Sequence, residues 1–120
     1  MEKITSSFRV ILREMVDIKY VYHGTSTGAV RRIQREGLQN DNNRPIYFSS
    51  REDYAETYAK RKDFRGGIML RTPLSNKIKP ADNIEIFNDY IEYYTRSIIE
   101  AKNIDIKINN TWKPLIKVEL

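Results

Sequence analysis

The most informative stretch, residues 18–38, reads IKYVYHGTSTGAVRRIQREGL. Its first five residues are mostly aromatic or β-branched, a composition typical of a strand. A run of small polar residues follows His23, and beyond it Val30 and Ile33 take one face of a predicted helix whose arginines lie mostly on the other. Gly37 ends this helix, because the residue after a helix often needs a positive φ that costs glycine little. The stretch therefore predicts a strand, a polar turn that begins at His23, and a helix.

Toward the N-terminus, residues 1–17 carry an amphipathic pattern. Their large apolar residues recur at the i, i+3, i+4 and i+7 spacing of one helical face, and they are Phe8, Ile11, Leu12 and Met15. We therefore expect an N-terminal helix that packs on a domain formed by residues 18–120.

Toward the C-terminus, a second strand and a second helix follow a polar loop. Residues 46–48 are apolar and aromatic, as in a short strand. Ser49 and Glu52 then have the spacing of a capping box, in which two side chains satisfy the first free amides of a helix. This helix is expected to end before the Gly-Gly pair that precedes a strand at residues 68–71.

The last third of the chain predicts one long helix and two strands. The helix, over residues 82–101, would align one apolar stripe made of Phe87, Tyr90, Ile91, Tyr94, Ile98 and Ala101. Residues 104–108 alternate between apolar and polar, which is typical of a half-buried strand. An Asn-Asn pair supplies a turn, and residues 115–120 alternate as a last strand. Because strands gather at the end and no glycine-rich phosphate loop is present, the order predicts a single α+β domain.

Composition narrows the classes of function. The chain has no cysteine, which excludes disulfides, thiolate metal sites and a cysteine nucleophile. Its single histidine leaves too few ligands for a structural zinc, so we expect no metal. No apolar run approaches the roughly 20 residues of a membrane span, so we expect a cytoplasmic protein without membrane contact. The net charge of +5 suits an anionic partner and equally suits simple solubility.

Four motifs, in order along the chain, resemble one enzyme superfamily. They are YHGTS at residues 22–26, a helix that ends EGL at residues 36–38, IYFSS at residues 46–50, and a further helix that bears Ala55 and Ala59. Together they resemble the ADP-ribosyltransferases, most closely the diphtheria-toxin and poly(ADP-ribose) polymerase branch, which carries a His-Tyr-Glu triad. The resemblance covers residues 18–120 and implies split mixed or antiparallel sheets flanked by helices. It also implies an enzyme that uses NAD to transfer ADP-ribose to a macromolecule, either protein or nucleic acid.

The resemblance implies roles for individual residues. His23 matches the histidine that hydrogen-bonds a ribose hydroxyl of NAD, and the backbone of Gly24 matches a contact with the nicotinamide carboxamide. Tyr47 matches the tyrosine that stacks on the nicotinamide ring. The family's catalytic acid is a glutamate at the start of the penultimate strand, which corresponds here to Asp105 or, as second choice, to Glu100. The cofactor-binding cleft is also expected to include Thr25, Ser49 and Tyr58.

Two other functions remain open from the sequence. One is a catalytically silent member of the same fold that binds nucleic acid, a nucleotide or a protein. The other is an RNA 2′-phosphotransferase-like enzyme, although the arginine-rich pattern of that enzyme is not evident near His23. His23 could also cap its own turn, and Tyr47 could pack within its strand, without any ligand.

Overall fold

The computed structural model describes residues 18–39, 42, 44–62, 66–81 and 91–120. Within this part of the chain lie two α-helices, α2 (Thr27–Glu36) and α3 (Glu52–Lys62). The strands are β1 (Tyr20–Thr25), β2 (Ile46–Ser49), β3 (Ile68–Pro73), β4 (Lys79–Pro80), β5 (Glu92–Thr95), β6 (Asp105–Ile108) and β7 (Thr111–Pro114). Two short 3₁₀ turns, η2 (Ala101–Asn103) and η3 (Leu115–Lys117), complete the described elements. Neither α-helix is long and apolar enough to cross a lipid bilayer.

The described strands form one seven-stranded sheet in the order β4-β5-β2-β1-β3-β6-β7, and every neighbouring pair is antiparallel. This architecture confirms the predicted α+β class, with more sheet than helix. The predicted helix over residues 1–17 lies outside the described residues, as do residues 82–90 of the predicted long helix.

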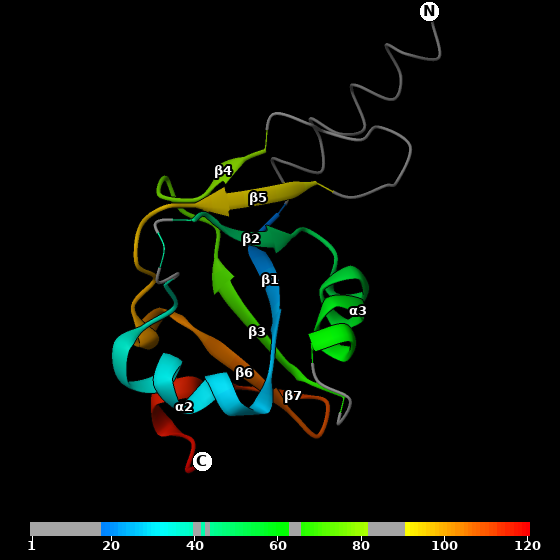
Figure 1. Ribbon diagram of the computed structural model, residues 1–120, viewed down its shortest axis with the longest axis vertical. Coiled ribbons are helices and arrows are strands. Elements are labelled where there is room, and N and C mark those ends of the chain that lie inside the picture. Colours follow the sequence, from blue (N-terminus) through cyan, green and yellow to red (C-terminus); the bar gives the residue numbers. More distant parts are fainter. Residues whose placement is uncertain (1–17, 40–41, 43, 63–65, 82–90) are drawn as a thin grey trace, which may run out of the picture.

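The sheet consists of two blocks that meet at β1 and β2. All six residues of β1 pair with β3, whereas the registered pair between β1 and β2 is Tyr22 with Ser49. Figure 1 shows β4, β5 and β2 running across the direction of β1 and β3, with α2 and α3 on opposite sides of β1. Because β1 continues to Thr25 beyond its pairing with β2, the two blocks diverge there.

The main core lies between α2 and the sheet. Val30 and Ile33 are the buried residues of α2, as its spacing predicted. They belong to a cluster that also includes Val21, Phe48, Leu70, Ile106 and Leu115. Gly37 ends the helix with φ of 84°, and its amide donates to the Ile33 carbonyl at 2.8 Å, so the predicted stop is confirmed.

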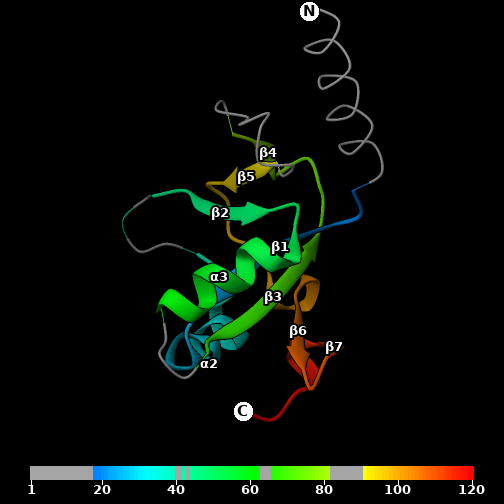
Figure 2. The same ribbon diagram turned by 90° about the vertical axis from the view of Figure 1, so that its right-hand side faces the viewer.

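α3 covers β1 and β3 on the other side, at very short range (Figure 2). Its contact face consists of Ala55 and Ala59, which are both buried. Opposite them lie Gly24 of β1 and Gly67, where any Cβ would collide with the α3 backbone. Small residues on both partners therefore set the distance between the helix and the sheet.

The predicted capping box of α3 is wrong. The Ser49 hydroxyl accepts a hydrogen bond from the Arg51 amide at 3.0 Å, one residue before the helix begins. The Glu52 carboxylate pairs with Lys107 of β6 instead of turning back to the helix start. Glu52 therefore forms a long-range ion pair with Lys107 instead of the local capping contact that its spacing from Ser49 predicted.

The predicted helix over residues 82–101 is wrong in its described part. Residues 92–95 form β5, which pairs with β2 on one side and with β4 on the other. Tyr93 and Thr95 are each 1% exposed, whereas Glu92 and Tyr94 are half-buried, so the true period is two. The spacing of apolar residues in this segment fits a helix and a strand equally well, and pairing with β2 decides between them.

The end of the chain matches the prediction in part. Asn109 and Asn110 have positive φ values of 50° and 61°, and they join β6 to β7 as the predicted turn. The predicted last strand over residues 115–120 is wrong. The last strand of the sheet, β7, covers Thr111–Pro114 instead. Leu115 then begins a 3₁₀ turn and is fully buried, which draws the chain into the core and away from the sheet.

Candidate functional site

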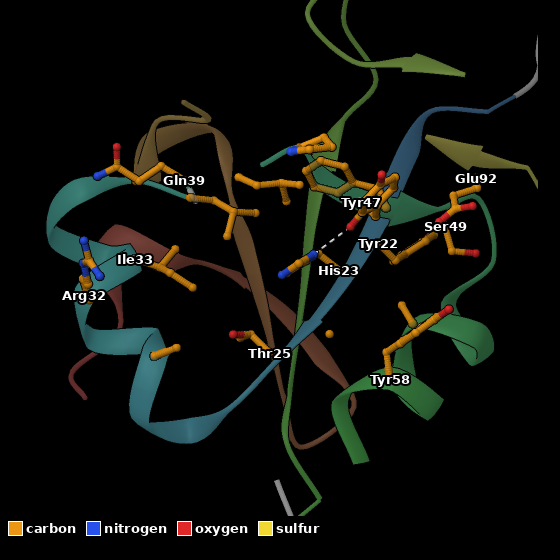
Figure 3. Close-up of a pocket in the computed structure, with 18 residues that line it drawn as sticks. Tyr22, His23, Thr25, Arg32, Ile33, Gln39, Tyr47, Ser49, Tyr58 and Glu92 are labelled. Atoms are coloured by element: carbon orange, nitrogen blue, oxygen red, sulfur yellow. Dashed lines mark hydrogen bonds between the residues drawn. The ribbon is translucent and has the colours of Figure 1, made fainter. Parts of the chain in front are cut away.

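A cavity of about 400 Å³ opens where β1 and β2 diverge. Its walls come from β1, β2, α3, the first residue of β5, and the helix α2 with the segment that follows it. The volume lies within the range of small-molecule and cofactor sites. Figure 3 shows the side chains that line it, with His23 between the α2 side and the α3 side.

His23 occupies the centre of this cavity and ties its two main strands together. The imidazole Nδ1 lies 2.8 Å from the backbone carbonyl oxygen of Tyr47, 24 residues along the chain (Figure 3). Because a carbonyl oxygen can only accept, Nδ1 carries the proton of this hydrogen bond. The neutral ring then has its acceptor at Nε2, which suits a ligand hydroxyl group. The predicted turn at His23 is wrong, because β1 continues to Thr25 and His23 pairs with Leu70 of β3. The ring bonds a different strand and does not cap a turn.

Two tyrosines expose their rings at the cavity. Tyr47 of β2 is 51% exposed and Tyr58 of α3 is 54% exposed, although both residues line the cavity. The neighbours of Tyr47 along β2, Ile46 and Phe48, are buried, so the alternation of the strand directs Tyr47 away from the core. Exposed aromatic rings at the wall of a cavity can stack on a planar ligand. Both tyrosines were predicted from the sequence.

Glu92 is the residue that the sequence prediction missed. It begins β5, pairs in register with Ser49 of β2, and lines the cavity. In Figure 3 it lies on the same side of His23 as Tyr47 and Tyr58. Buried and half-buried residues alternate from Ile91 to Thr95 in the structure, but the apolar spacing of this segment fits a helix equally well, so no signal in the sequence singled out Glu92.

Neither of the predicted acids lines this cavity. Asp105 of β6 accepts a hydrogen bond from Arg71 Nε at 2.9 Å, and both side chains are largely buried. The guanidinium of Arg71 also lies 4.0 Å from the ring centroid of Tyr20 and 4.6 Å from that of Trp112. Glu100 is exposed and pairs with Lys102 at 3.2 Å. Asp105 thus belongs to a packed ion pair in the sheet rather than to the cavity wall.

The other residues predicted for the cleft, Thr25, Ser49 and Gly24, also line the cavity. Thr25 and Ser49 are buried, and Ser49 is held by its bond with the Arg51 amide. Gly24 also lines the cavity. However, the backbone of α3 already fills the space that a Cβ at Gly24 would occupy. The packing of α3 on β1 is therefore enough to require glycine here, without any ligand.

The charges on the cavity wall are separated. Among the described lining residues, Arg32 is the basic side chain and Glu92 the carboxylate, and they lie at opposite sides of His23 (Figure 3). Tyr22 also lines the cavity, and burial raises the pKa of its hydroxyl above the ordinary value, with the charge of Glu52 acting in the same direction. Tyr22 is therefore a neutral hydrogen-bond donor at physiological pH.

Comparison of the chain with protein-family models, with curated proteins and with solved structures gave no match. Within the described residues, no group of three or more His, Asp or Glu side chains is arranged to hold a metal ion. The geometry of the cavity, together with the sequence around His23, therefore carries the functional conclusion.

Proposed function

We propose that this chain is an NAD-dependent ADP-ribosyltransferase and that the cavity around His23 is its active site. The supporting observation is that His23, Tyr47, Tyr58 and Glu92 come from four separate elements and line one cavity. His23 and Tyr47 match the family pattern by sequence, and Tyr58 was expected in the same cleft. In this proposal Glu92 takes the role of the family's glutamate, although it begins β5 rather than the penultimate strand. The divergence of the two blocks of the sheet at β1 and β2 is consistent with the split sheets that the resemblance implies.

In this proposal Glu92 stabilises the reacting ribose. The bond between ribose C1′ and the nicotinamide ring nitrogen breaks, and its electron pair leaves with neutral nicotinamide. Carbon C1′ gains oxocarbenium character until a nucleophilic atom of the acceptor bonds to it and releases a proton to Glu92 or to solvent. A carboxylate fixed beside the developing positive charge lowers the barrier, because it needs no reorganisation during the reaction.

The other residues hold NAD in a reactive position. Nε2 of His23 accepts a hydrogen bond from a ribose hydroxyl, while Nδ1 remains fixed on the Tyr47 carbonyl. The rings of Tyr47 and Tyr58 stack on the nicotinamide, and the positive charge of the pyridinium strengthens this contact. The acceptor is a macromolecule, either protein or nucleic acid, and the net charge of +5 suits an anionic one.

The proposal is tested with two forms of labelled NAD. We expect that label in the adenylate phosphate transfers to macromolecules of a cell lysate when the purified protein is added, whereas label in the nicotinamide is released. Separate treatment with nuclease and protease then identifies the class of acceptor. If NAD binds but neither label moves, the chain is a silent binding module, and the proposed activity is contradicted.

A further inference from the structure

The two charged side chains of the cavity wall suggest how a ligand is oriented. Arg32 of α2 lies on one side of His23, and Glu92 of β5 lies on the other (Figure 3). NAD carries a positive pyridinium at one end and a doubly negative pyrophosphate beyond the first ribose. A pyridinium near Glu92 therefore directs the pyrophosphate toward the arginine side of the cavity.

We propose that Arg32 binds the pyrophosphate of NAD and that Glu36 competes with the phosphate for the Arg32 guanidinium. This inference rests on the proposed function and adds the residue that recognises the phosphate part of the substrate. A guanidinium presents donors in a planar fork that matches two phosphate oxygens, which makes arginine well suited to this contact.

The ion pair between Arg32 and Glu36 can be exchanged for another contact. Arg32 Nε lies 2.6 Å from Glu36 Oε2, one turn along α2, and the two side chains are 51% and 46% exposed. Exposed pairs at this spacing on a helix contribute little to stability, because water solvates both partners when they separate. A pyrophosphate with two negative charges attracts the guanidinium more strongly than one carboxylate, so it displaces Glu36.

Arg32 is the arginine of α2 that lines the cavity. Arg31 and Arg35 are also exposed, but neither lines the cavity. Arg31 therefore provides a matched control, since its replacement removes the same charge from the same helix. Any loss of binding that is specific to Arg32 then reports a contact in the cavity rather than the total charge of the protein.

The test compares ligands that contain and lack the phosphates. Isothermal titration of the native chain, Arg32→Gln, Arg31→Gln and Glu36→Gln is carried out with NAD, ADP-ribose and nicotinamide. We expect Arg32→Gln to weaken binding of NAD and ADP-ribose by about tenfold, the scale of one hydrogen-bonded contact to a charged group, and to leave nicotinamide binding unchanged. Glu36→Gln removes the competitor and should strengthen NAD binding by about twofold. Arg31→Gln should match the native chain.

Three results overturn the inference in different ways. If the native chain binds ADP-ribose and Arg32→Gln binds it as well as Arg31→Gln does, Arg32 does not recognise the phosphates, although the proposed function still stands. If Arg32→Gln also loses nicotinamide, the variant has disturbed the cavity as a whole and the assignment to the pyrophosphate fails. If the native chain binds neither NAD nor nicotinamide, both the inference and the proposed function are contradicted.

Discussion

Replacement of Glu92 by glutamine should lower the rate of nicotinamide release from NAD at least ~100-fold, the scale seen when one preorganised electrostatic group is lost. Glutamine keeps the size of the side chain but removes the charge that stabilises the oxocarbenium-like ribose. Because Glu92 is only half-buried at the start of β5, the melting temperature should change little. Initial rates at saturating NAD, followed by chromatography of free nicotinamide, measure the effect.

Asp105→Asn is the matched control for this experiment. It makes the same chemical change at the residue that the sequence alone favoured as the acid. Since Asp105 pairs with Arg71 and does not line the cavity, the variant should keep nearly native turnover and lose on the order of 1 kcal/mol of stability. Loss of turnover in Asp105→Asn, with retention in Glu92→Gln, would return the catalytic role to Asp105.

Replacement of Gly24 by alanine should destabilise the fold by about 3 kcal/mol or more. The new Cβ would lie 2.6 Å from the Ala59 amide nitrogen and would also collide with the Ala55 carbonyl oxygen. These atoms belong to the backbone of α3, so no side-chain rotation relieves the contact and the helix must move away from β1. Urea denaturation followed by circular dichroism measures the change in the free energy of unfolding.

Gly28→Ala provides the comparison for Gly24→Ala. Gly28 lies in the first turn of α2, and nothing is found within 4 Å of the position that its Cβ would occupy. Alanine should therefore leave stability unchanged or raise it by up to about 1 kcal/mol, because it loses less backbone entropy on folding than glycine does. Equal stability of the two variants would contradict the close packing of α3 on β1.

Local signals in the sequence predicted those parts of the fold that local interactions determine. The stop at Gly37 and the turn at Asn109 and Asn110 both depend on the φ angle of single residues, and both are confirmed. The helix α2 has one well-separated apolar face, Val30 with Ile33, and its register was predicted correctly. The cavity residues on β1, β2 and α3 were predicted through the family resemblance, which depends on short motifs along the chain rather than on the bounds of each element.

The first residue of β5 could not be predicted from the same kind of signal. Residues 92–95 become a strand because β2 and β4 lie on either side of them, and those strands are distant in sequence. The resemblance assigned the acid to the start of the penultimate strand, which is Asp105 of β6, whereas the carboxylate that lines the cavity begins β5. Pairing across the sheet, rather than propensity, thus determines which carboxylate lines the cavity.

Gly24 shows a second limit of reasoning from sequence. The position of Gly24 next to His23 suggested that the ligand needs the space of the missing side chain. The structure accounts for this glycine through Ala55 and Ala59 of a helix that begins 28 residues later. Only the three-dimensional arrangement reveals which neighbour occupies the missing side chain's place.

The most direct test of the central claim, that NAD binds around His23, uses the single histidine of the chain. Its imidazole nitrogen signals can be observed by NMR without ambiguity while NAD is added. We predict that, before NAD is added, the neutral ring carries its proton on Nδ1, and that NAD shifts the Nε2 resonance most while Nδ1 stays protonated, because its bond with the Tyr47 carbonyl persists. Imidazole signals that remain unchanged at millimolar NAD would contradict the account.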